Sequence, residues 1–148
     1  MPTLSISQLS PNLATTEHEK AWAAQKQLAP ALVIRADAAA AEHRASFQKA
    51  LSAGVKMALG SDISPMRDSA LLELGLWVKC GATPWQALTA ATKNAAEMCG
   101  VGPELGTVEP GKLADLIVGD GNPLDDIENI RNLELVIKEG RVVADHRG

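Results

Sequence analysis

Asp62 is the side chain whose type and position best suit chemistry. It follows the apolar run at residues 55–59 and the pair Gly60-Ser61. We predict that this run is a strand of a parallel sheet, buried on both faces. The carboxyl ends of such strands are where α/β folds build active sites. A carboxylate there can bind a metal or accept a proton from a metal-bound water. The alternative is that Asp62 caps the following loop, as aspartate often does after a strand.

The three histidines do not extend this site in the sequence. His18, His43 and His146 form no H-x-H pair, and none follows a predicted strand. We interpret His18 and His43 as solvated residues on helices with charged neighbours, and His146 as part of a C-terminal tail that frays. Asp115 opens an apolar strand pattern, where it could cap a turn or pair with Lys112, so we expect a structural role.

The remaining candidates carry weaker signals. Arg67 and Asp68 could line a pocket above the strand ends, or serve as loop and helix-cap residues. Ser61 has no G-x-S-x-G context, which argues against a nucleophilic serine. Cys80 and Cys99 lack C-x-x-C spacing, and we expect both to be reduced and partly buried.

The composition limits the possible classes of protein. The chain has 148 residues, 46% of them hydrophobic, which is enough for one domain with a core. Its net charge is −4 and no basic stripe is present, so we expect no nucleic-acid partner. No apolar run reaches the ~18–20 residues of a membrane span, and the N-terminal residues resemble no signal peptide. We therefore expect no membrane association and a cytoplasmic location.

The elements that must position Asp62 can be read from local signals. Residues 2–6 alternate like a strand, and residues 10–12 form a loop. Thr16 and Glu19 form a capping box that opens a helix through residue 28, which Pro30 then kinks or interrupts. An alanine-rich helix is predicted over residues 36–53, and Gly54 ends it.

The second half of the chain changes character after residue 103. A helix is predicted over residues 68–80, and Thr83, Pro84 and Gln86 give the next helix, to residue 99, a complete start signal. A strand at 114–118, a short helix at 125–130 and a hairpin at 133–138 and 141–144 around Glu139-Gly140 follow. The fold class is therefore α/β, with two β-α units of a parallel sheet and a small antiparallel tail.

Four segments together resemble one family. Residues 54–62 end in Gly-Ser-Asp and resemble its eighth barrel strand. Residues 81–92 resemble its G-x-T-P-x-x-A-L-x-A-A-T helix. Residues 105–116 resemble its G-x-x-x-x-G-K-x-A-D-L segment, and residues 136–143 its closing hairpin. The family is the amidohydrolase superfamily, and the resemblance is strongest to its imidazolonepropionase and metal-dependent prolidase or carboxypeptidase branch. Residues 2–4 resemble its seventh strand.

The resemblance implies a fold and a chemistry. The family fold is a (β/α)8 TIM barrel with a small β-domain, and its members hydrolyse C–N bonds in small-molecule amides, dipeptides or cyclic amides with one or two divalent metals, zinc among them. Asp62 would be the metal ligand and proton acceptor after strand eight. This chain would then hold about the last two β-α units of the barrel in residues 1–103, and a β-domain segment in residues 104–148.

The other metal ligands of the family have no counterpart in this sequence. Its H-x-H pair, its strand-four ligand and the histidines after strands five and six are all missing, and one carboxylate does not hold a catalytic zinc. We expect a C-terminal fragment that needs an N-terminal half and does not retain metal or activity alone. Two alternatives are a non-catalytic, self-associating module with exposed strand edges, and an oligomer in which His18 or His43 reaches Asp62 of a neighbour.

Overall fold

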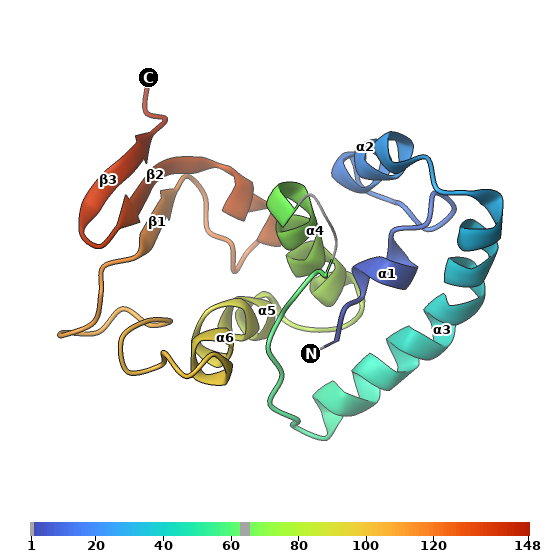
Figure 1. The fold of residues 1–148 in the computed structure, drawn as a ribbon, viewed down its shortest axis with the longest axis horizontal. Coiled ribbons are helices and arrows are strands. Elements are labelled where there is room, and N and C mark those ends of the chain that lie inside the picture. The colour runs from blue at the N-terminus through green and yellow to red at the C-terminus, as the bar shows by residue number, and fades with distance from the viewer. Residues whose placement is uncertain (1, 63–65) are drawn as a thin grey trace.

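The structure is a helical body with a small antiparallel sheet beside it (Figure 1). The computed structural model describes residues 2–62 and 66–148. The elements in chain order are α1 (Ser5–Gln8), α2 (Glu17–Lys26), α3 (Pro30–Ser52), α4 (Met66–Lys79), α5 (Pro84–Ala91), α6 (Lys93–Met98), β1 (Leu116–Gly119), the 3-10 helix η1 (Ile127–Arg131), β2 (Leu133–Lys138) and β3 (Arg141–Asp145). No helix within the described ranges is long and apolar enough to cross a membrane.

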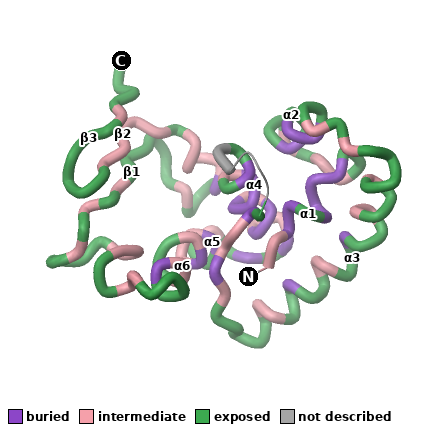
Figure 2. Tube along the Cα trace, in the orientation of Figure 1, coloured by how far each residue is buried: buried purple, intermediate pink, exposed green. Residues whose placement is uncertain are grey.

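The core is built around α4. Leu72, Leu76 and Trp77 of this helix are almost fully buried, and Phe47 of α3 meets the Trp77 ring edge-on at 4.9 Å. Ile127 of η1 joins the same cluster, which fixes the segment before the hairpin to the helical body. Figure 2 shows the buried residues gathered around α4 and α1, whereas most of α3 and of the sheet is exposed.

Two of the predicted helix starts are confirmed, whereas the alanine-rich helix predicted over residues 36–53 begins earlier, at Pro30. Both capping boxes form, at Thr16 and at Thr83. Pro30 begins α3 instead of kinking the previous helix, because α2 has already ended at Gln27 in the left-handed conformation. The helix predicted to run to residue 99 is divided at Thr92, whose φ of −115° and ψ of −85° are not helical.

The two strands predicted before residue 60 are wrong. Residues 5–8 form α1, and residues 55–59 belong to no helix or strand. A strand is stabilised by hydrogen bonds to its neighbours, and the sheet that the structure describes contains only β1, β2 and β3 in antiparallel order. The α/β class holds through helices and this small sheet, with no parallel pair among the described strands.

The C-terminal hairpin is confirmed. β2 and β3 pair around Glu139 and Gly140, which both have positive φ values of 51° and 78°, as tight hairpin turns require. Asp115 supports the turn, because its carboxylate accepts a hydrogen bond from the Glu139 backbone N–H at 2.8 Å and pairs with Lys138. Its partner is therefore Lys138 and not Lys112, and its role is structural.

Candidate functional site

Asp62 lies at the end of a short segment that is fixed from two sides. The buried Ser61 accepts a hydrogen bond at its carbonyl oxygen from Ser5 Oγ of α1, at 2.9 Å. Its own hydroxyl lies 3.1 Å from Ser69 Oγ of α4. Asp62 follows with a φ of +50°, and its side chain is exposed. Aspartate tolerates this left-handed conformation better than most residues, so the backbone presents the carboxylate outward from an anchored base.

One face of α4 provides that anchor. Ser69, Glu73 and Trp77 are spaced by four residues, share a face and are at most 1% exposed. The Glu73 carboxylate accepts hydrogen bonds from the backbone N–H groups of Leu4 and Ser5, at 2.7 and 2.8 Å, and from Trp77 Nε1 at 3.3 Å. Burial raises the pKa of Glu73, and these donors act in the opposite direction. Glu73 thereby holds the residue whose hydroxyl binds the Ser61 carbonyl.

A buried ion pair joins α4 to α2. The buried Glu19 carboxylate lies 2.9 Å from Lys79 Nζ and accepts hydrogen bonds from the backbone N–H groups of Thr15 and Thr16. Burial alone would raise its pKa, but these hydrogen bonds and the Lys79 ammonium outweigh burial and hold the pKa below its usual value. This pair fixes the position of α2 against the helix that anchors Ser61.

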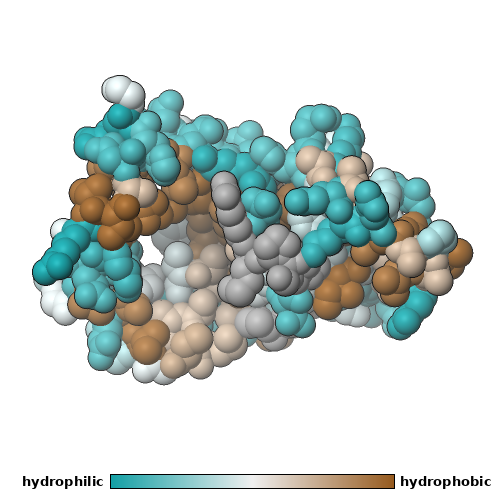
Figure 3. All heavy atoms as spheres, turned by 45° about the horizontal axis from the view of Figure 1, so that its top comes forward, coloured by the Kyte–Doolittle hydropathy of each residue, from teal (hydrophilic) through white to brown (hydrophobic). Residues whose placement is uncertain are grey.

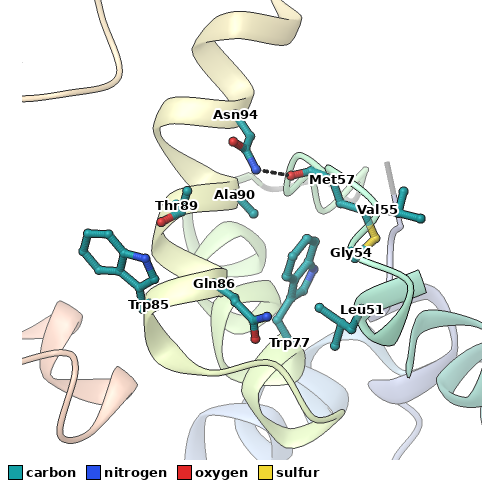
Figure 4. Close-up of a pocket in the computed structure, with 10 residues that line it drawn as sticks. All are labelled: Leu51, Gly54, Val55, Met57, Trp77, Trp85, Gln86, Thr89, Ala90 and Asn94. Carbon is teal, nitrogen blue, oxygen red and sulfur yellow. Dashed lines mark hydrogen bonds between the residues drawn. The ribbon is translucent and has the colours of Figure 1, made fainter. Parts of the chain in front are cut away.

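The segment that leads to Asp62 is held by α5 and α6. Leu59 N donates to the Ala90 carbonyl at 3.0 Å, and Asn94 Nδ2 donates to the Met57 carbonyl at 2.8 Å. Figure 4 shows the latter bond across a cavity of about 200 Å³ that Trp77 and other side chains line. The residues that line this cavity include no acid or base. They hold the segment in place but provide no catalytic groups.

The described residues do not form a complete metal site. A catalytic zinc typically has three protein ligands, and no group of three His, Cys, Asp or Glu side chains within the described ranges could hold a metal. His18 is exposed, as predicted. His146 is also exposed, but its backbone N–H donates to the Glu134 carbonyl at 2.7 Å, so the prediction of a frayed tail is wrong at this residue. His43 is half-buried with Nδ1 at 2.8 Å from Ser7 Oγ, so the prediction that it is solvated is wrong. The residues at hand therefore do not fit a metal without further ligands.

The structure agrees with the sequence-based expectations for some of the other candidate residues and not for others. Asp68 lies in the first turn of α4 and lines a cavity of about 210 Å³ with residues of α2 and η1, so the predicted pocket above strand ends is not found there. The side chain of Arg67 lies outside the described part of the chain. Cys80 is fully buried and burial raises the pKa of its thiol. Cys99 is exposed, so the expectation that it is partly buried is wrong.

The comparison with known sequences decides the family. The pattern of the amidohydrolase family matches residues 7–143, which is most of the chain. The chain belongs to that family. The resemblance carried by residues 54–62, 81–92, 105–116 and 136–143 is thereby confirmed, and the relatives of this chain hydrolyse C–N bonds.

Individual amidohydrolases match over part of their length. Imidazolonepropionase of Thermoplasma volcanium is 37% identical over 101 residues, which cover 64% of this chain and 25% of the relative. Ochratoxinase of Aspergillus niger is 42% identical over 95 residues, 62% of this chain and 19% of the relative. The crystal structure of a Xaa-Pro dipeptidase with bound methionine superimposes on 96% of this chain with a TM-score of 0.75 and 28% identity, and 33% of that protein is covered. The chain thus spans about a quarter of the length of its curated relatives.

The polar contacts that support Asp62 were not predicted from the sequence. Ser5, Ser69 and Glu73 are ordinary residues in the sequence, and the partners of Ser5 and Glu73 are far along the chain. One signal was available, because Ser69 and Glu73 fall at helical spacing with Trp77 on an otherwise apolar helix. Polar residues at the spacing of a buried face require partners.

Proposed function

We propose that this chain provides one part of an amidohydrolase active site, with Asp62 as its metal ligand and proton acceptor. The observation that carries the proposal is the presentation of Asp62. An exposed carboxylate follows a segment that resembles the family's eighth strand, and the residue before it is held by Ser5 and Ser69. Family membership supports a hydrolase of C–N bonds.

The proposed activity requires residues from outside the described chain. Asp62 alone does not fit a metal, and the chain spans about a quarter of its curated relatives. We infer that a divalent cation, zinc in our proposal, is bound only when a further part of the barrel contributes ligands, either in a longer chain or in a partner. Residues 1–103 would then be the barrel segment and residues 104–148 the β-domain segment, acting on small amides, dipeptides or cyclic amides.

A chimera tests this proposal. This chain would replace the matched region of the Aspergillus niger ochratoxinase, and metal content and hydrolysis would be measured for the chimera and for the chain alone. We expect metal and activity in the chimera only, and their loss in Asp62→Asn but not in Asp120→Asn, an exposed carboxylate elsewhere. Stoichiometric zinc in the isolated chain, or full activity of the Asp62→Asn chimera, would overturn the proposal.

A second candidate is a self-associating module without catalysis. Apolar side chains of the sheet are exposed, including Ile117 at 52%, Val142 at 56% and Val143 at 61%, and Figure 3 shows hydrophobic surface there. Exposed apolar patches often mark interaction sites. Sedimentation equilibrium tests this candidate: a dimer that Val143→Lys dissociates supports it, and a monomer at all concentrations contradicts it.

A further inference from the structure

An apolar groove lies between α1, α2 and α3, and the proposed activity does not use it. The groove measures about 510 Å³, which is within the ~300–1,000 Å³ typical of small-molecule sites. In Figure 1, α1 and α2 lie on the same side of α3. The groove is open to solvent, since Ile6 is 59% exposed and Leu32 49% exposed. Its apolar lining comes from Ile6, Trp22, Leu28, Leu32, Ala36 and Ala39.

One face of α3 gives the groove its depth. Residues at positions i, i+3, i+4 and i+7 of a helix share a face, and here these positions are Leu32, Arg35, Ala36 and Ala39. The two alanines are small and leave a recess along the helix. Ile6 of α1 lines the same groove, so the recess lies between aliphatic side chains of two helices.

The charged side chains in this lining are both positive. Arg35 is exposed and makes no hydrogen bond or ion pair with another described residue. Lys26 adds a second cation, with its Nζ 5.6 Å from the centre of the Trp22 ring. The residues that line the groove include no acid, although the whole chain has a net charge of −4. The groove therefore favours an anionic group beside an apolar one.

The polar side chains of the lining are already hydrogen-bonded. Ser5 Oγ donates to the Ser61 carbonyl at 2.9 Å, and Ser7 Oγ lies 2.8 Å from His43 Nδ1. A peptide segment would bring N–H and C=O groups that need partners once they leave water, and the apolar walls do not provide them. An unbranched hydrocarbon chain needs no such partners, and a carboxylate at its end matches Arg35.

We propose that this groove binds a free medium-chain fatty acid. The carboxylate pairs with the Arg35 guanidinium, and the alkyl chain lies in the recess along Ala36 and Ala39, against Ile6. This site involves neither Asp62 nor a metal, so it stands or fails independently of the proposed hydrolysis.

Isothermal titration calorimetry with sodium decanoate, kept below its micelle concentration, tests the site. We expect saturable binding with a single decanoate per chain. Hexanoate has a shorter chain and should bind about ten-fold or more weakly, because fewer methylenes are buried. Decylammonium has the same chain length with a positive head group, and it should also bind about ten-fold or more weakly, because the two cations repel it. No saturable decanoate binding, or equal binding of decylammonium, would overturn the proposal.

Two variants separate the head-group contact from the apolar contact. Arg35→Gln should weaken decanoate binding about ten-fold or more, because a hydrogen bond between charged groups is lost. Arg141→Gln, at an exposed arginine outside this lining, should change nothing. Ala36→Phe should fill the recess and abolish saturable binding, with circular dichroism as the check on folding. If Ala36→Phe does not fold, the exposed Arg35 position carries the test, and unchanged binding in Arg35→Gln would refute the site.

Sedimentation equilibrium distinguishes a fatty acid from a second copy of this chain as the occupant of the groove. A chain whose state of association is the same in Ala36→Phe as in the wild type, and that binds decanoate, supports the proposal. A dimer that Ala36→Phe dissociates, in a protein that does not bind decanoate, would assign the groove to self-association and overturn the proposal.

Discussion

Replacing Glu19 should destabilise the protein far more than replacing Glu17, although both are acidic residues in the first turn of α2. Glu19 is 3% exposed, pairs with Lys79 at 2.9 Å and closes the capping box with Thr16. Glu17 pairs with Lys20 of the same helix, and its side chain is 89% exposed. The two positions therefore provide a matched comparison of a buried and an exposed ion pair.

The magnitude follows from what each substitution leaves behind. Removing one member of a buried ion pair costs ~3–5 kcal/mol, and loss of a helix cap costs about 1 kcal/mol. Lys79 is 23% exposed and keeps its hydrogen bond to the Leu13 carbonyl, which places Glu19→Ala near the lower limit, about 3 kcal/mol. Glu19→Gln keeps one acceptor oxygen and should cost less. Glu17→Ala should cause no measurable change, because exposed pairs are screened by solvent.

Urea denaturation followed by tryptophan fluorescence measures this difference, since Trp22 and Trp77 lie in the two helices that the pair joins. With a urea dependence of about 2 kcal/mol per molar, a loss of about 3 kcal/mol lowers the midpoint by about 1.5 M. Equal midpoints for Glu19→Ala and Glu17→Ala would refute the conclusion that the buried pair stabilises the fold.

The pH dependence provides a second check on the same pair. The pKa of Glu19 is held below its usual value of 4.5 in the folded protein, so the unfolded chain binds a proton first as the pH falls. The contribution of Glu19 to the free energy of unfolding is therefore present above about pH 4.5 and is lost as the pH falls through the lowered pKa. The stability difference between wild type and Glu19→Gln should shrink in acid. A difference that stays constant to pH 2 would contradict this assignment.

Three further outcomes are expected from the structure. Glu73→Ala should lower the free energy of unfolding by about 3 kcal/mol, since it leaves buried N–H donors unpaired at ~1–3 kcal/mol each; an unchanged urea midpoint would contradict this. Gly106→Ala should cost about 2 kcal/mol more than Gly111→Ala. Both glycines have φ near +90°, but only at Gly106 would an added Cβ meet other atoms, the nearest at 2.6 Å. Equal thermal midpoints for the two alanine variants would exclude this clash. Cys99 should react rapidly with a thiol reagent in the native protein and Cys80 only on unfolding, so two fast equivalents would refute the burial of Cys80.

Local sequence signals determined most of the helices and the hairpin. The capping boxes at Thr16 and Thr83 are formed by hydrogen bonds between residues three apart, so the local sequence is enough to predict these helix starts. The turn at Glu139 and Gly140 likewise depends on two adjacent residues with positive φ. The four segments at residues 54–62, 81–92, 105–116 and 136–143 together also indicated the family, because they record shared ancestry and do not depend on the contacts that the chain makes.

Only the tertiary structure decided how Asp62 is held. Residues 55–59 have the composition of a buried strand, but a strand needs neighbours to pair with, and here the contacts come from α5 and α6 instead. Residues 2–6 alternate like a strand, yet the backbone N–H groups of Leu4 and Ser5 bind Glu73, which is 69 and 68 residues away in the sequence, respectively. Such contacts depend on which side chains meet when the helices pack, and no local pattern encodes them. The sequence therefore singled out Asp62 as a candidate, and the packing of α1 against α4 determined how this carboxylate is presented.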